Sequence, residues 1–224
     1  MTRIFAAIGL VLILGLGVAY FFRGDIALFA FRQGLAQAMP RDTVAELPDG
    51  LAAMMCGTGS PLPDALRAGP CTAVVAGGKV FIVDAGSGSA RTLLRMGLRM
   101  ERVEALLLTH FHSDHMDGLG EAAMLRWTGS AATAPLRVFG PEGVDRVVDG
   151  FNAAYAMDAV YRTAHHGPET VPPEGHGMIA VPFDLPRDLV PGAGSAHEIY
   201  RDGDLVISAF RVNHAPIEPA VGYR

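Results

Sequence analysis

Lysine is almost absent from this 224-residue chain, and no block rich in lysine and arginine occurs in it. The formal net charge is −5, from 18 basic and 23 acidic residues. A dedicated nucleic-acid binder carries clustered basic side chains that neutralise phosphates. The composition therefore argues against nucleic acid as a partner, although a local patch on a net-acidic protein would still allow one.

Cysteine is also scarce. Cys56 and Cys71 flank a loop rich in glycine and proline, and their separation does not fit the short spacing of a zinc knuckle. The two thiols can pair in an oxidising compartment, or they can be two small buried residues at strand ends. A glycine-rich phosphate-binding fingerprint is missing as well, because Gly57-Thr58-Gly59 lacks the remaining glycines and the helix start.

An apolar run, Ile4–Phe22, stands near the N-terminus between Arg3 and Arg23. Its length is just enough to span a bilayer as a helix, and a cleaved secretory signal is the alternative. We interpret residues 1–24 as a signal anchor or signal peptide and residues 25–50 as a juxtamembrane segment and linker. This N-terminus predicts a membrane-anchored protein on the periplasmic or extracellular side, or a protein secreted after cleavage.

The remainder of the chain alternates apolar strand patterns with helical ones, which predicts α/β layers. Cys71–Ala76 and Lys79–Asp84 are expected to form a hairpin that turns at Gly77-Gly78. Val103–Leu108 is entirely apolar except for Glu104, as expected of a strand in a sheet buried on both faces. Glu142–Thr163 predicts a long helix. Half of all residues are hydrophobic, enough for a sizeable core.

Three histidines and one aspartate follow the apolar strand within six positions, His110 to His115. Imidazole nitrogens and carboxylate oxygens are the ligands that zinc prefers. His110 and His112 point the same way in an extended loop, because alternate residues share a face. The chain then turns, so Asp114 and His115 face a second metal position beside the first. One loop can therefore offer two ligands to one metal ion and two to another.

This HxHxDH phrase after a short buried strand resembles the signature of the metallo-β-lactamase-fold hydrolases. The segments CGTGSPLPDALRAGPCTAVVAGGKVFIVDAG, LLLTHFHSDHMDGLGE and VNHAPIEPAVGYR are similar, in that order, to the arylsulfatase-type and tRNase Z-type branch. The phrase H-x-P-x-x-P-A-x-G-Y-R leans towards the arylsulfatase-like group. The resemblance covers residues 51–224 and implies an αββα sandwich, with two mixed sheets face to face and helices outside.

The resemblance also implies a set of metal ligands. His110, His112 and His214 match the ligands of the first metal, and Asp114 and His115 match those of the second. Three neutral imidazoles leave a tetrahedral zinc ion one open position for water, as in catalytic sites, and zinc lowers the pKa of bound water to about 7. Asp114 is expected to orient the hydroxide as well, and is our candidate catalytic residue.

Other polar residues carry two interpretations each. In the first interpretation, Asp84 orients a metal-bound histidine by accepting a hydrogen bond from the ring nitrogen that does not bind the metal. In the second, Asp84 is a turn-forming aspartate before Ala-Gly. His165 and His166 close the long helix before Gly167, which is ordinary helix-end chemistry. A role for these two histidines at the mouth of a substrate site is the alternative.

The printed chain departs from the family pattern at its end. It stops at Gly222-Tyr223-Arg224, where the family continues with a further strand, a bridging aspartate and a final histidine. We therefore expect a truncated chain with an incomplete second sheet. The expected cofactor is Zn²⁺, with two ions in a full-length parent and one or fewer firmly held in this chain.

The leading functional hypothesis is a zinc-dependent hydrolase that attacks a small-molecule ester, specifically a sulfate ester, with metal-bound hydroxide. The alternatives are a tRNase Z-like phosphodiesterase or endoribonuclease, a lactonase or β-lactamase, and an inactive truncated module tethered to the membrane. The sequence gives no indication of the oligomeric state.

Overall fold

The computed structural model describes residues 20–25, 27, 42–62, 64–186 and 192–224. The chain divides into two units, residues 1–41 and 42–224, and the fold described below is that of the second unit. The predicted membrane or signal helix lies almost entirely outside the described residues. Within the described part of the chain, no helix is both long enough and apolar enough to cross a bilayer.

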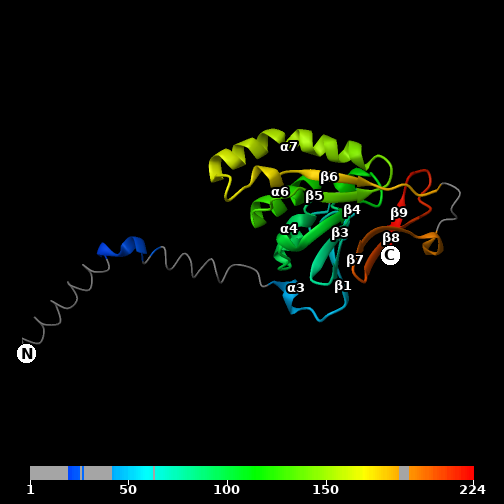
Figure 1. The fold of residues 1–224 in the computed structure, drawn as a ribbon, viewed down its shortest axis with the longest axis horizontal. Helices are drawn as coiled ribbons and strands as arrows, with labels where there is room; N and C mark the ends of the chain where they lie inside the picture. The colour runs from blue at the N-terminus through cyan, green and yellow to red at the C-terminus, as the bar shows by residue number, and fades with distance from the viewer. Residues whose placement is uncertain (1–19, 26, 28–41, 63, 187–191) are drawn as a thin grey trace, which may run out of the picture. The chain divides into compact units, whose positions relative to one another are not determined.

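A mixed six-stranded sheet forms the centre of the fold, in the order β1-β2-β3-β4-β5-β6 (Figure 1). The first three strands pair antiparallel and the last four pair parallel. The predicted hairpin is β2–β3, and both of its turn glycines, Gly77 and Gly78, have the positive φ that a tight two-residue turn requires. The strands are Leu51–Gly57 (β1), Cys71–Ala76 (β2), Lys79–Val83 (β3), Val103–Leu107 (β4), Leu136–Gly140 (β5) and Met178–Pro182 (β6).

Helices cover one face of this sheet. Ile82, Leu106 and Val138 point from the central strands into the main core, where Leu93 of α4 and Leu119 of α6 meet them. These strand residues share one face because alternate side chains of a strand point to opposite sides of the sheet. The α-helices are Thr43–Glu46 (α3), Ser89–Arg95 (α4), Ser113–Met116 (α5), Leu119–Ser130 (α6) and Val144–His166 (α7), with short 3₁₀ helices at Met100–Arg102 (η1), Pro173–Gly175 (η2) and Ala193–Ser195 (η3).

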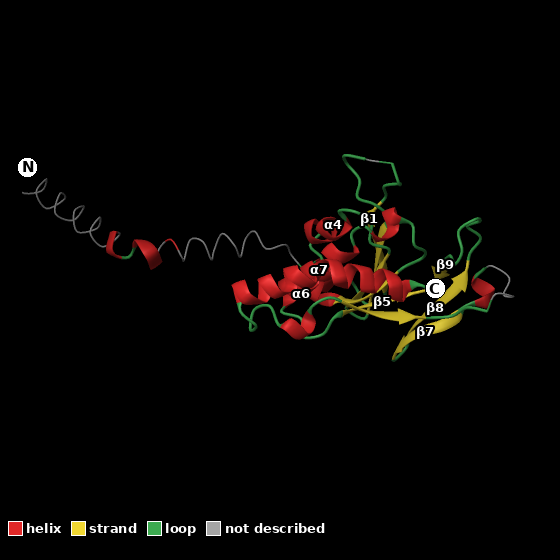
Figure 2. Ribbon diagram, turned by 90° about the horizontal axis from the view of Figure 1, so that it is seen from above, coloured by secondary structure: helices red, strands yellow, loops and turns green. Residues whose placement is uncertain are grey.

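A second, antiparallel sheet in the order β7-β8-β9 packs on the opposite face (Figures 1 and 2). Phe81, Leu107 and Phe139 of the first sheet meet Tyr200 and Ile207 of the second. This packing confirms the predicted α/β sandwich. Among the described residues no α-helix follows α7, so the second helical layer of the predicted αββα order has no counterpart there. The strands are His197–Asp202 (β7), Leu205–Arg211 (β8) and Val221–Tyr223 (β9).

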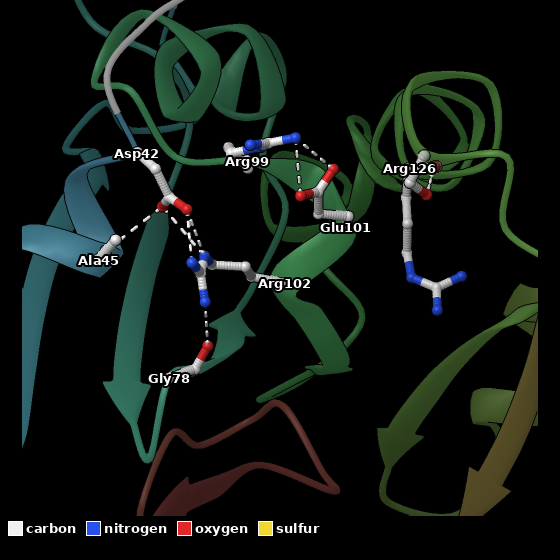
Figure 3. Close-up of polar contacts among 8 residues, drawn as sticks. Asp42, Ala45, Gly78, Arg99, Glu101, Arg102 and Arg126 are labelled. Carbon is white, nitrogen blue, oxygen red and sulfur yellow. Dashed lines mark hydrogen bonds and ion pairs between the residues drawn. The ribbon is translucent and has the colours of Figure 1, made fainter.

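The residues just before β1, which we assigned to the linker, are fixed to the sandwich by an ion pair (Figure 3). The Asp42 carboxylate accepts hydrogen bonds from the Arg102 guanidinium at 2.9–3.0 Å and from the Ala45 amide at 3.4 Å. Arg102 also donates to the Gly78 carbonyl at 3.2 Å. Val44 of α3 is buried in the main core. Residues 42–46 are therefore an integral part of the domain.

Cys56 and Cys71 form a disulfide bond, which settles the alternative that the sequence left open. Cys56 lies at the end of β1 and Cys71 at the start of β2, with their Cα atoms 5.0 Å apart. Both residues are almost completely buried. The bond closes the base of the segment between β1 and β2.

Candidate metal centre

The histidine-rich loop leaves the carboxyl end of β4, beside the end of β3. Parallel pairing brings the two strand ends together, and the Asp84 amide donates to the Leu107 carbonyl at 2.9 Å. The Ala85 amide donates to the His115 carbonyl at 2.8 Å. A Cβ atom at Gly86 would lie 2.4 Å from the Asp114 carbonyl oxygen, so only glycine allows this close approach. The backbone after β3 therefore supports the loop that carries the motif.

Asp84 is buried beneath this loop and accepts three hydrogen bonds. Its donors are the Thr109 amide at 2.8 Å, the Thr109 hydroxyl at 2.8 Å and the His115 Nδ1 atom at 2.7 Å. Asp84 has a φ of +59°, a left-handed conformation that aspartate tolerates better than most residues. The structure thus places the Asp84 carboxylate within hydrogen-bonding distance of His115 and of Thr109, the residue before His110.

These hydrogen bonds determine which ring nitrogens of His110 and His115 keep a lone pair that can bind a metal ion. The Thr109 hydroxyl has one proton, and when it donates that proton to Asp84 it accepts from His110 Nδ1 at 2.9 Å. The Nε2 atom of His110 then keeps its lone pair. In the same way His115, when its ring is neutral, donates from Nδ1 to Asp84 and keeps a lone pair on Nε2. Thr109 has a role that the sequence reading missed, although its place directly before the motif was visible.

His110, His112 and His214 bring one ligand nitrogen each to a common point, with all three atoms within 4.8 Å of one another. The His110 Nε2 and His112 Nδ1 atoms face each other at 2.9 Å. Nitrogen ligands about 2.0–2.1 Å from a tetrahedral zinc ion lie about 3.4 Å apart, so the three residues fit one metal ion. His110 is buried, whereas His112 and His214 are exposed and leave the centre open to a substrate.

His214 reaches the centre through the second sheet. It follows β8, and the chain returns as β9, whose Val221 amide donates to the Thr109 carbonyl at 2.9 Å. The Tyr223 hydroxyl donates to the Leu108 carbonyl at 2.6 Å. β9 is thus attached directly to the start of the motif loop. The contribution of Tyr223 was not predicted, because no spacing in the sequence indicates it.

Asp114 and His115 lie beside this group of three. The His115 ring centroid is 4.2 Å from that of His110, and its Nε2 atom is 3.7 Å from the Asp114 carboxylate. The two residues that we matched to a second metal therefore adjoin the first group. A cavity of about 590 Å³ is lined by Asp114 and by described residues of the segment between β1 and β2, including Ser60 and Arg67.

Burial and neighbouring charges shift the pKa values of His110 and His115. Burial lowers the pKa of His110 to about 4, with the neighbouring His115 adding to the effect, so the ring is neutral near pH 7. Burial also acts to lower the pKa of His115. The hydrogen bond and charge of Asp84, with the charge of Asp114, outweigh it and raise the pKa above its usual value. His110 is therefore ready to act as a ligand.

The structure does not bring His165 and His166 to this centre. α7 begins beside it, since a Cβ atom at Gly143 would lie 3.3 Å from the Phe111 ring. The helix is 23 residues long, so its last residues lie about 34 Å away along its axis. The suggested role of these two histidines at a substrate mouth therefore has no geometric support.

Comparison with known proteins identifies relatives of this chain. Residues 65–209 match the family model of the metallo-β-lactamase superfamily. A protein of Mycolicibacterium gilvum named Ribonuclease Z is 37% identical over 172 residues, which is 76% of this chain and 55% of that protein. A Ribonuclease Z of Mycobacterium bovis is 38% identical over 172 residues, 76% of this chain and 56% of that protein. The chain thus spans about half the length of these curated relatives.

Among solved structures, human tRNase Z, short form (ELAC1), aligns with a TM-score of 0.53 and 20% sequence identity. The alignment covers 76% of this chain and 63% of the human chain. At this identity the likeness concerns the fold. It agrees with the sandwich described above.

The names of the relatives correct two expectations. The prediction that nucleic acid is an unlikely partner is contradicted, because the relatives are named for ribonuclease activity. Net charge is a sum over the whole chain, and it does not exclude a local surface that contacts RNA. The small-molecule ester and the membrane, which we named as partners, gain no support, and neither does the arylsulfatase interpretation.

Proposed function

Because the chain belongs to the metallo-β-lactamase superfamily, whose hydrolase fold it shares, we propose that it hydrolyses phosphodiester bonds in RNA with the help of zinc. The observation that carries the proposal is the convergence of His110, His112 and His214 in a chain whose relatives are named Ribonuclease Z. This was our alternative hypothesis, and it now replaces the sulfate ester.

Zinc is the proposed metal because of the donor set. Three imidazole nitrogens suit zinc better than magnesium or calcium, which prefer oxygen ligands. A zinc ion with three protein ligands acts as a Lewis acid and lowers the pKa of coordinated water. His110, His112 and His214 would hold this ion, and Asp114 with His115 would hold a second one beside it.

The residues behind the ligands have distinct roles in this proposal. Asp84 fixes the ring of His115 directly and that of His110 through Thr109, so that each Nε2 lone pair faces the centre. Because Asp84 is buried and accepts three hydrogen bonds, these rings are held before a substrate arrives. Asp114 is one of the residues that line the adjoining cavity. In this proposal its carboxylate accepts a proton from an attacking water.

The proposal is tested by three substrates assayed side by side with the zinc-loaded full chain. They are a transfer RNA transcript, bis-p-nitrophenyl phosphate and p-nitrophenyl sulfate. We expect cleavage of the RNA and the phosphodiester, and no turnover of the sulfate. His110→Ala should reduce cleavage to the level of buffer, whereas His165→Ala, an exposed histidine away from the centre, should leave it unchanged. Turnover of the sulfate with intact RNA would refute the proposal.

A further inference from the structure

The basic residues of the chain are distributed unevenly. Four of its 18 basic residues lie within the twelve positions 91–102, namely Arg91, Arg95, Arg99 and Arg102. Mostly apolar residues separate them, so they form no continuous basic run in the sequence. Arg102 is bound to Asp42 and fixes the start of the domain, whereas the other three are exposed. We call the first two, Arg91 and Arg95, the α4 arginines.

The α4 arginines share one face of the helix because they are about one turn apart. Leu93, which lies between them in the sequence, is buried in the main core, so the opposite side of α4 faces solvent. Arg91 and Arg95 are about 6 Å apart along the helix axis. The Arg95 guanidinium donates to the Thr92 hydroxyl at 2.9 Å. This bond holds it toward the start of the helix, the direction in which helical side chains lean.

α4 begins at the edge of the cavity that Asp114 lines. Ser87, two residues before the first residue of the helix, is another lining residue of this cavity. α6 lies beside α4 (Figure 1). It begins two residues after Asp117, which lines the same cavity. The α4 arginines therefore lie on a helix that leads away from the cavity beside the metal centre.

An ion pair joins the first turns of α4 and α6. The Arg91 Nε atom lies 2.5 Å from the Glu121 Oε1 atom. The Glu121 side chain is only 19% exposed, whereas the Arg91 side chain is 72% exposed. A guanidinium has five N–H donors, so a carboxylate that meets Nε leaves most donors of this exposed group accessible. Glu121 therefore orients Arg91 without covering it.

Phosphate groups are the ligands that such arginines fit. The planar guanidinium matches the geometry of a phosphate and keeps its charge at any physiological pH. An RNA strand with its scissile bond at the metal centre carries further phosphates on either side of that bond. We propose, on the premise of the proposed function, that Arg91 and Arg95 bind phosphates of the RNA strand where it leaves the cavity over α4. Such contacts position the RNA and carry no sequence information.

Salt-dependent binding of a fluorescently labelled transfer RNA transcript, followed by fluorescence anisotropy, tests the inference. The full chain is kept free of zinc so that the RNA stays intact. In Arg91→Gln with Arg95→Gln, the Kd should rise about 10-fold at about 0.1 M salt, and the slope of log affinity against log salt should become shallower by about 1.5–2. An unrelated RNA of the same length should show the same change, because phosphates are common to all sequences.

Two control variants separate the charge of the α4 arginines from their place in the fold. Arg201→Gln on β7 removes an exposed arginine that also pairs with a glutamate, Glu198, and should leave RNA binding unchanged. Arg91→Lys with Arg95→Lys keeps both positive charges and should retain most of the wild-type slope. Circular dichroism and urea unfolding verify that all variants fold.

Glu121→Gln gives the sharpest result. Because Glu121 competes with phosphate for Arg91, this variant should bind RNA about 2–3-fold more tightly, opposite in sign to Arg91→Gln. A purely structural ion pair would shift both variants in the same direction.

Three results would overturn the inference: an unchanged salt slope in the double glutamine variant, a Glu121→Gln variant that binds no more tightly than the wild type, or a wild type that binds no RNA. The last result would refute the proposed function as well. RNA that is bound with the expected slopes and never cleaved by the zinc-loaded chain would refute the proposed function alone.

Discussion

The rings of His110 and His115 are held by hydrogen bonds to buried neighbours, whereas His112 and His214 lie at the open side of the same centre. We call His110, His115, Thr109 and Asp84 the inner half. Asp84 is 6% exposed and accepts a hydrogen bond from His115, and Thr109 carries its influence to His110. The inner half is therefore fixed by the fold itself.

The outer half, His112 and His214, is exposed. His214 depends on a chain that leaves β8, turns, and returns as β9 to the carbonyl of Thr109. The comparison indicates that the two halves contribute differently to stability and to metal binding. Under the proposed function, the inner half would couple the metal centre to the stability of the domain, whereas the outer half would supply ligands whose loss the fold should tolerate. The predictions below separate these effects.

Asp84→Ala should have the largest effect, because it removes the acceptor of three hydrogen bonds in a buried place. We expect the free energy of unfolding to fall by about 3 kcal/mol, and zinc affinity to fall about 10–100-fold. Urea unfolding and zinc competition with a chelator measure the two effects. Asp84→Asn is the milder companion. A variant with unchanged zinc affinity would show that the inner half is structural only.

His214→Ala should weaken zinc binding strongly, because it removes one of the three ligands from the first position. The side chain is exposed, so the free energy of unfolding of the metal-free chain should change by less than about 0.5 kcal/mol. The same two measurements apply. A large loss of stability in the metal-free variant would contradict the contrast between the halves.

Thr109→Val should show an intermediate behaviour. It keeps the shape of the side chain but removes the hydroxyl between Asp84 and His110. We expect a loss of about 1–1.5 kcal/mol in unfolding free energy and a decrease of about 10-fold in zinc affinity. Thr109→Ser, which retains the hydroxyl, is the control and should bind zinc nearly as well as the wild type.

Asp42→Asn should have the smallest effect and none on zinc, since Asp42 is bound to Arg102 and Ala45 at the start of the domain. The hydrogen bond from Arg102 lowers the pKa of Asp42 in the folded chain. Its stabilisation is therefore complete above the unfolded pKa of about 4, and is lost as the pH falls through the lower folded value.

Urea unfolding between pH 2 and pH 7 checks this last prediction. The variant should lose about 1 kcal/mol or less at pH 7 and should match the wild type more closely at pH 2. A change in zinc affinity would show that any loss of stability in the domain weakens zinc binding. A lower zinc affinity of Asp84→Ala would then no longer be evidence for a specific role of Asp84 at the metal centre.

Much of the centre could be predicted from sequence because its residues are close in the chain or at strand ends. His110 to His115 form one loop, and Asp84 ends a strand that was expected beside the apolar strand before it. His214, Thr109 and Tyr223 are different. Only a resemblance indicated His214, and the hydroxyl contacts of the other two depend on distances that no spacing encodes.

The remaining errors have physical reasons as well. Pairing of Cys56 and Cys71 could not be decided from sequence, because it depends on Cα atoms that come within 5.0 Å only after β1 and β2 pair. The expectation that nucleic acid is an unlikely partner rested on net charge, and net charge carries no information about where charges lie. The long helix α7 was predicted correctly, but only the structure shows that Met157, Val160 and Tyr161 of this helix are exposed.

The most direct test of the central claim is X-ray absorption spectroscopy of the zinc-loaded full chain and of His214→Ala. The account predicts a first shell with three histidine nitrogens at about 2.0–2.1 Å in the wild type, and one imidazole fewer in the variant. A shell with no imidazole signature, or one that is the same in both proteins, would contradict it.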